Sequence, residues 1–152
     1  MYGFVGPIVL FAIVRLLAPF GWARAPSEGP TCISNLKQMT LGCLMYAADH
    51  DDTLPLARNW MDVAATYHLN SSVFHDPSDV PDGAFGYALR AQAAQRKTTT
   101  FAGPETFLLI FDSTAEGRNA TAELATVPNP GRHQGIDNGA YLDGHARHIV
   151  GR

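Results

Sequence analysis

The start of the chain is far more hydrophobic than the rest. Residues 3–23 hold a single charge, Arg15. As one helix this span would be about 30 Å long, which is enough to cross a bilayer. Pro7, Pro19 and Gly21 weaken that helix, because proline removes a backbone donor and glycine has a low helix propensity. The pattern therefore predicts an apolar helix that is interrupted toward its C-terminal end.

Three interpretations of this segment stay open. A secretory signal peptide would end at the small-residue site Ala23-Arg24-Ala25, but Arg15 breaks its apolar run and no basic region precedes it. A plain membrane anchor would stay in the bilayer, with Arg15 reaching the interface or a partner. In the third interpretation the helix is held in the membrane first and is later buried in the core of a filament.

A second helix is expected after the breaker-rich linker 24–30. Thr31 or Ser34 can cap it, and its pattern runs to about Ala48. Hydrophobic residues recur along it at helical spacing and predict a face that packs on a core, a role compatible with packing on neighbouring subunits. The members of this stripe are Cys32, Ile33, Leu36, Met39, Cys43, Leu44, Tyr46 and Ala47.

The periodicity is weaker in the middle of the chain. It predicts short helices over residues 59–69 and 87–95. Between them, residues 70–86 hold several Pro, Gly, Asp and Ser, which are typical of a loop.

The last third of the chain has the pattern of strands. Residues 106–111 form a compact β-prone run. Asp143-Gly144 lies between two alternating segments of residues 139–149, which is the signature of a two-residue hairpin turn. The whole pattern predicts an α+β fold: a long apolar N-terminal helix in residues 1–30, and a head in residues 31–152 that combines helices with strands.

Composition and charge narrow the function classes. The 152 residues are 46% hydrophobic and 16% charged, with a net charge of −3. The basic residues are scattered, with no run longer than Arg96-Lys97, so we expect no nucleic-acid partner. Cys32 and Cys43 lie eleven residues apart in one predicted helix, with Cα atoms about 16 Å apart. That separation exceeds the reach of a disulfide.

Six short pieces of the sequence occur together in an order that matches a known group. They are residues 32–38 with 44–47, 49–55, 74–79, 85–87, 104–112, and the C-terminal motif of His133, nine residues, then Asp143-Gly144. Over residues 31–149 the chain resembles bacterial prepilin-type cleavage/methylation proteins with this C-terminal motif, which are similar to the major pseudopilins of type II secretion. The resemblance implies a long N-terminal helix, interrupted near residues 18–30, whose second half packs on a small antiparallel sheet.

The chain departs from this group at two places. The resemblance puts prepilin-peptidase cleavage between Gly3 and Phe4, although the usual basic leader and the glutamate at the fifth mature position are absent. The group also has a cysteine where this chain has Asp76. The expected partner of Cys32 is therefore missing, and Cys32 is predicted to be a free, buried thiol.

Two metal sites are candidates. His133, Asp143 and His145, with Asp137 and His148 nearby, suit a transition metal. In the competing interpretation, His133 hydrogen-bonds Asp143 or a turn backbone and pins the hairpin. At the end of the predicted helix, the resemblance suggests calcium at Asp49, Asp51 and Asp52, and carboxylate oxygens suit that ion. Solvated acids that end the helix are the alternative there.

The remaining candidate chemistry is sparse. No nucleophile constellation or phosphate loop is present, so we expect a protein that is not an enzyme and has no cofactor, calcium excepted. Asn70 and Asn119 stand in glycosylation sequons.

The leading hypothesis is a structural subunit of an extracellular type IV pilus-like or pseudopilus filament. Its precursor sits in the inner membrane, and copies then assemble through apolar side chains of the first helix. We expect these to be Phe4, Ile8, Leu10, Phe11, Ile13, Leu16 and Leu17. The alternative is a membrane-anchored or secreted binding module that does not polymerise and holds a metal or ligand at the C-terminal hairpin.

Overall fold

The computed structural model describes residues 28–67, 69–77, 85–115, 117–133 and 135–149. Its helices and strands are, in chain order, α2 (Glu28–Asp49), α3 (Trp60–Ala65), β1 (Tyr87–Arg90), β2 (Leu108–Asp112), β3 (Thr121–Ala122), β4 (Asp137–Tyr141) and β5 (Ala146–Ile149). The predicted apolar helix, with its cleavage and assembly residues, lies outside the described residues. None of the described helices is long and apolar enough to span a membrane.

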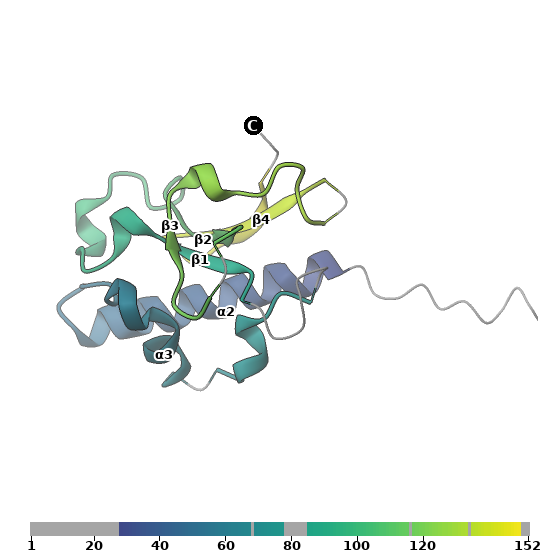
Figure 1. The fold of residues 1–152 in the computed structure, drawn as a ribbon. Helices are drawn as coiled ribbons and strands as arrows, with labels where there is room; N and C mark the ends of the chain where they lie inside the picture. The colour runs from purple at the N-terminus through teal and green to yellow at the C-terminus, as the bar shows by residue number, and fades with distance from the viewer. Residues whose placement is uncertain (1–27, 68, 78–84, 116, 134, 150–152) are drawn as a thin grey trace, which may run out of the picture.

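The helix α2 lies along one face of a five-stranded sheet, and α3 packs against α2 (Figure 1). The helix begins at Glu28, so the cap predicted at Thr31 or Ser34 is wrong. Gly29 and Pro30 fall in its first turn, where backbone N–H groups have no intrahelical partner and a proline therefore costs little.

The predicted stripe of α2 is confirmed as the face that meets the core. Cys32, Leu36, Met39 and Cys43 are all fully buried, and Ala47 is nearly so. The last four of these residues pack on Tyr87 and Leu89 of β1, Leu109 and Ile110 of β2, and Ala140 of β4. Burial of this face supplies most of the stabilisation of the helix, because helices in proteins are stabilised mainly by the packing of an apolar face rather than by helix propensity.

The sheet has the order β3-β1-β2-β4-β5. The pairs β1–β2, β2–β4 and β4–β5 are antiparallel, whereas β3 runs parallel to β1, so the sheet is mixed rather than purely antiparallel as predicted. The helix predicted at residues 87–95 is also wrong. Its first half is the central strand β1, and a short 3-10 helix, Ala91–Ala93, follows.

The strand β2 confirms the predicted β-prone run, and all five of its residues are buried. Its pairing with β4 shifts by one residue between Leu108 and Ile110. The shift puts Leu109 and Ile110 both on the α2 side, while Leu108 and Phe111 face the other side. A bulge of this kind explains why the run is continuously apolar instead of alternating.

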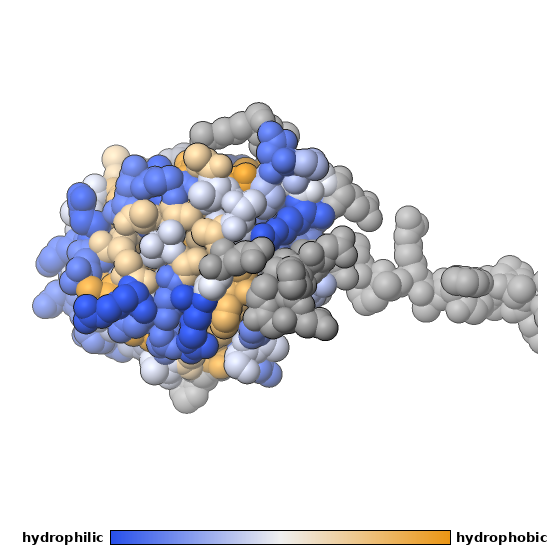
Figure 2. Space-filling view, in the orientation of Figure 1, coloured by the Kyte–Doolittle hydropathy of each residue, from blue (hydrophilic) through white to orange (hydrophobic). Residues whose placement is uncertain are grey.

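The second face of the sheet is also covered. Leu108, Phe111 and Tyr141 pack there against Leu124 and Val127 of the connection between β3 and β4. This connection crosses the sheet on the side opposite α2 (Figure 1). On the face that Figure 2 shows, hydrophobic residues lie among hydrophilic ones.

The C-terminal hairpin is confirmed, but its turn differs from the prediction. Tyr141 pairs with His145 through Tyr141 N–H to His145 O at 2.8 Å, which leaves a three-residue loop over 142–144. Gly144 alone in that loop has a positive φ, +91°. This is the hairpin in which a turn is followed by a left-handed residue, and glycine is the residue that adopts that conformation without strain.

Candidate functional site

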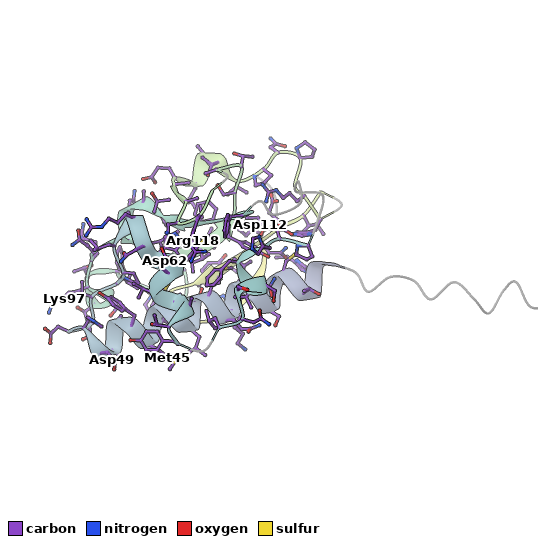
Figure 3. All side chains as sticks on the ribbon, turned by 60° about the horizontal axis from the view of Figure 1, so that its bottom comes forward. Met45, Asp49, Asp62, Lys97, Asp112 and Arg118 are labelled. Atoms are coloured by element: carbon purple, nitrogen blue, oxygen red, sulfur yellow. The ribbon has the colours of Figure 1, made fainter. Side chains whose placement is uncertain are left out.

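Buried polar side chains gather where the start of α2 meets the paired ends of β2 and β4. Asp76, Asp112, Asp137 and Asn138 are all buried there, and the Cys32 thiol is fully buried beside them. Figure 3 shows Asp112 inside the head, away from Asp49 and Lys97 at the opposite end. We call Cys32, Asp76, Asp112, Arg132 and His133 the buried polar cluster.

Four separate segments bring the cluster together. Cys32 belongs to the core-facing stripe of α2, and Asp112 is the last residue of β2. Asp76 follows the 3-10 helix Ser71–Phe74, whose Val73 and Phe74 are anchored in the core. His133 lies in the turn before β4, where its backbone N–H donates to Ile136 O at 2.9 Å.

The contacts of Cys32, Asp76 and His133 define the centre of the cluster. The Cys32 thiol donates to Asp76 Oδ1 at 3.2 Å. His133 Nε2 lies 3.9 Å from Asp76 Oδ2 and 3.3 Å from Asp112 Oδ2. One donor atom each of Cys32, Asp76 and His133 lies within 4.8 Å of the others, and no other set of three Cys, His, Asp or Glu residues in the described part of the chain does so.

Arg132 is the permanent cation of the cluster. Its guanidinium donates to Gly86 O at 3.0 Å and to Ser113 O, and it lies 3.4 Å from Asp76 Oδ2. A Cβ on Gly86 would come within 2.5 Å of Arg132 Nη1 and 2.6 Å of Asp76 Cβ. Glycine is required there because any side chain would separate the ion pair.

Burial dominates the electrostatics of the cluster. It raises the pKa of the Asp112 carboxyl and of the neighbouring Asp137 carboxyl above their usual range. It also raises the pKa of the Cys32 thiol, and the Asp76 carboxylate raises it further. The Asp112 carboxylate raises the pKa of His133 by favouring the imidazolium. Three buried carboxyl groups thus face one guanidinium and one imidazole.

The cluster is incompletely hydrogen-bonded. Asp112 Oδ2 accepts from the backbone and side-chain N–H groups of Asn138 at 2.6 and 3.1 Å, but Asp112 Oδ1 is buried without a hydrogen-bond partner. His133 Nε2 is also buried, and its contact with the Asp112 carboxylate, 3.3 Å away, does not have the geometry of a hydrogen bond. Unpaired buried polar atoms cost about 1–3 kcal/mol each, so native structures rarely leave two together.

The predicted transition-metal ligands are divided between two places. His133 belongs to the buried polar cluster, whereas Asp143 lies in the exposed hairpin loop and contacts His145 Nδ1 at 2.6 Å. The prediction that His133 bonds Asp143 is wrong, since its partners are Asp76 and Asp112. The reason is the register of β4 and β5, which puts the hairpin loop at the far end of β4 from the turn of His133.

The two flanking candidates also contact other groups. Asp137 Oδ1 accepts the backbone N–H of Arg132 at 3.0 Å, and His148 Nδ1 lies 2.8 Å from Asn138 Oδ1. Both residues therefore brace β4 and β5 at the border of the buried polar cluster.

The three aspartates proposed as calcium ligands lie at the C-terminal end of α2. Asp51 and Asp52 adopt left-handed φ values of 52° and 60°, a conformation that aspartate tolerates and that commonly ends helices. Asp49 Oδ2 accepts from the Tyr67 hydroxyl at 2.8 Å. All three are exposed, and they do not bring their carboxylates together as Cys32, Asp76 and His133 do.

The asparagines of the two glycosylation sequons differ in the hydrogen bonds that their side chains make. Asn70 is exposed, and its side chain accepts from Ser72 N at the start of a 3-10 helix. Asn119 Oδ1 accepts from Met61 N at 2.7 Å, and Asn119 Nδ2 donates to Asp62 Oδ2 at 2.6 Å. A glycan on Asn119 would remove the second bond, so the contacts favour Asn70 as the acceptor.

The sequence analysis identified some residues of the buried polar cluster and did not identify others. The free, buried state of Cys32 is confirmed. Its thiol contacts Asp76, the position where the group that the sequence resembles has a cysteine. The sequence analysis did not identify Asp112 or Arg132 as site residues. Asp112 could have been found as an acidic residue at the end of an apolar strand, and Arg132 as a charged residue next to His133.

Comparison with protein-family models, curated proteins and solved structures found no match for the chain.

Proposed function

We propose that the chain is a structural subunit of an extracellular type IV pilus-like or pseudopilus filament, assembled through its apolar N-terminal segment. The observation that carries this proposal is the position of α2. The helix starts at Glu28, directly after the apolar stretch of residues 3–23 and its short linker, and it runs the length of the head (Figure 1). A hydrophobic segment followed by a head-bound helix is the arrangement that the resemblance implies.

The core of the head supports the same proposal. The stripe of α2 is already covered by the sheet, so the described core is closed among its own residues. The apolar stretch before α2 gains most free energy where lipid or other copies of itself cover it, at about 25 cal/mol per Å² of apolar surface. A head-to-tail contact between such copies need not close and therefore propagates into a helical array.

The outward face of α2 offers a second contact. Leu41 and Met45 lie one turn apart and are 55% and 42% exposed. Figure 3 shows Met45 on the side of α2 that faces away from the sheet. We infer that this pair packs on a neighbouring subunit after assembly.

The test is deletion of residues 4–22 in cells that express the protein. The full chain should give filaments in sheared surface material under the electron microscope, and the deletion variant should give a soluble, monomeric, folded head. Thr99→Asp, at an exposed position, is the matched control and should still assemble. Filaments from the deletion variant would refute the proposal, as would a mature N-terminus beyond Ala25, read by mass spectrometry, on a monomeric protein.

The alternative function, a module with a metal at the C-terminal hairpin, has less support. Its proposed ligands His133, Asp143 and His145 are divided between the interior and an exposed loop. The filament subunit therefore remains our proposal.

A further inference from the structure

We propose that Cys32, Asp76 and His133 bind one divalent transition-metal ion, with zinc as the preferred ion. The site lies inside the head and is independent of the assembly function. It differs in two of three ligands from the site that the sequence suggests at the hairpin.

The spacing of the donor atoms fits this ion. Zinc binds sulfur, nitrogen and oxygen at about 2.0–2.3 Å, so neighbouring donors in a tetrahedral site lie about 3.3–3.6 Å apart. Cys32 Sγ and Asp76 Oδ1 are 3.2 Å apart, and His133 Nε2 and Asp76 Oδ2 are 3.9 Å apart. These two distances involve different oxygens of Asp76, and one donor atom of each residue lies within 4.8 Å of the others, so the donors move closer together when the ion binds.

The unsatisfied atoms of the cluster point to a bound cation independently of that spacing. His133 Nε2 and Asp112 Oδ1 are both buried without hydrogen-bond partners, and the His133 side chain is 7% exposed. Coordination would satisfy Nε2, and the positive ion would stabilise the adjacent Asp112 carboxylate. Asp112 Oδ2 and Asp76 Oδ2 lie 3.3 Å and 3.9 Å from Nε2, and neither contact has the geometry of a hydrogen bond.

The charges agree with a divalent ion. Asp76, Asp112 and Asp137 bring three carboxyl groups into the interior, against Arg132 as the permanent cation. Binding of the ion replaces the Cys32 thiol proton, which leaves to solvent, and forms a metal–thiolate bond. A donor set of thiolate, imidazole and carboxylate favours zinc over calcium or magnesium, which take oxygen ligands.

The neighbours of the donors are placed to hold them. Asp76 is fixed by Arg132, which is itself held by Gly86 O and Ser113 O. His133 is fixed by the backbone pair with Ile136. Fixed ligands of this kind raise metal affinity, because less side-chain entropy is lost on binding.

Cobalt titration of the full-length protein in detergent, freed of metal and kept reduced, tests the proposal. We expect one equivalent of Co²⁺ to bind, with a thiolate-to-cobalt charge-transfer absorption that Zn²⁺ abolishes. Cys32→Ala should lose this absorption, and Asp76→Asn and His133→Asn should each weaken binding by more than the roughly 10–100-fold that loss of a second-shell partner costs. Cys43→Ala is the matched control: Cys43 is equally buried on the same helix but has only apolar neighbours, so the absorption should remain.

A second measurement needs no variant. X-ray absorption at the zinc edge of the zinc-loaded wild-type protein should show one sulfur among the ligands. An all-nitrogen-and-oxygen shell would overturn the proposal, as would a charge-transfer band that survives in Cys32→Ala or is absent from the wild type. Circular dichroism of each variant separates loss of binding from loss of folding.

Discussion

The head holds two polar networks with opposite electrostatics. One joins Asp62 of α3 to Arg118 and Asn119 and lies at the surface, with the Asp62 and Arg118 side chains 44% and 52% exposed. The other is the buried polar cluster, in which the Asp76 and Asp112 side chains are fully buried. Figure 3 shows Asp62 beside Arg118 and Asp112 deeper in the same view.

The surface network is complete within the chain. Asp62 accepts from Asn119 Nδ2, from Arg118 Nε at 2.7 Å and from the Arg118 Nη2 group. These hydrogen bonds, that of Asn119 first, lower the pKa of Asp62, whereas burial raises the pKa of Asp112. The contrast teaches that a carboxylate with enough donors needs no further partner, while a buried one with an unpaired oxygen leaves room for a cation.

The largest difference between the networks should appear when each loses its arginine. Arg132→Met removes the donors to Gly86 O and Ser113 O and leaves Asp76 buried beside an apolar chain. We expect this change to lower the free energy of unfolding by about 3–5 kcal/mol. Urea denaturation followed by circular dichroism measures it.

Arg118→Met is the matched change in the surface network. Because solvent screens the exposed ion pair, it should cost less than about 1 kcal/mol. Equal losses from the two variants would mean that burial does not distinguish the networks.

A cysteine in place of Asp76 should convert the buried polar cluster into a covalent link. The Cys32 thiol already contacts the Asp76 carboxylate at 3.2 Å, across a separation of 44 residues. A disulfide closing that loop should stabilise the oxidised Asp76→Cys variant over its reduced form by up to about 4 kcal/mol. Thermal unfolding with and without a reductant gives the difference.

The same change in a Cys32→Ala background is the control. Its only other cysteine partner is Cys43, which is buried further along α2. That variant should show no redox-dependent shift. A shift of equal size would place position 76 next to Cys43 and contradict the fold.

The elements with regular hydrophobic spacing could be predicted from the sequence. The stripe of α2 and the run of β2 each carry their own pattern, and both are confirmed. β1 could not be predicted, because Tyr87–Arg90 precedes an alanine-rich stretch whose local propensity favours a helix. Pairing with β2 on one side and β3 on the other outweighs that propensity.

The candidate site could be predicted only in part. His133 was singled out, and the resemblance linked Cys32 to position 76 in advance. The meeting of His133 with Asp112 depends on the register of β2 against β4 and on the turn before β4. Neither leaves a local signal in the sequence, so the ligand set was assigned to the hairpin loop instead.

The smallest expected effect is the pH dependence of the stabilisation that the surface network provides. The folded-state pKa of Asp62 is lowered by Asn119 and Arg118, so the folded state favours the ionised carboxylate. Its stabilisation is present above the unfolded pKa of about 3.9 and is lost as the pH falls through the folded pKa. Because the side chain is 44% exposed, we expect less than about 1 kcal/mol.

Asp62→Asn isolates this contribution. The free energy of unfolding of the wild type, measured in urea, should fall more between neutral and acid pH than that of the variant, and the gap between the two should shrink on acidification. The other titrating groups are common to the two proteins, so the shrinkage reports the Asp62 carboxylate. If the difference in free energy of unfolding stays constant with pH, Asp62 contributes through packing and neutral hydrogen bonds. The surface network would then not be stabilised by the charge of Asp62, and the electrostatic contrast between the two networks would fail.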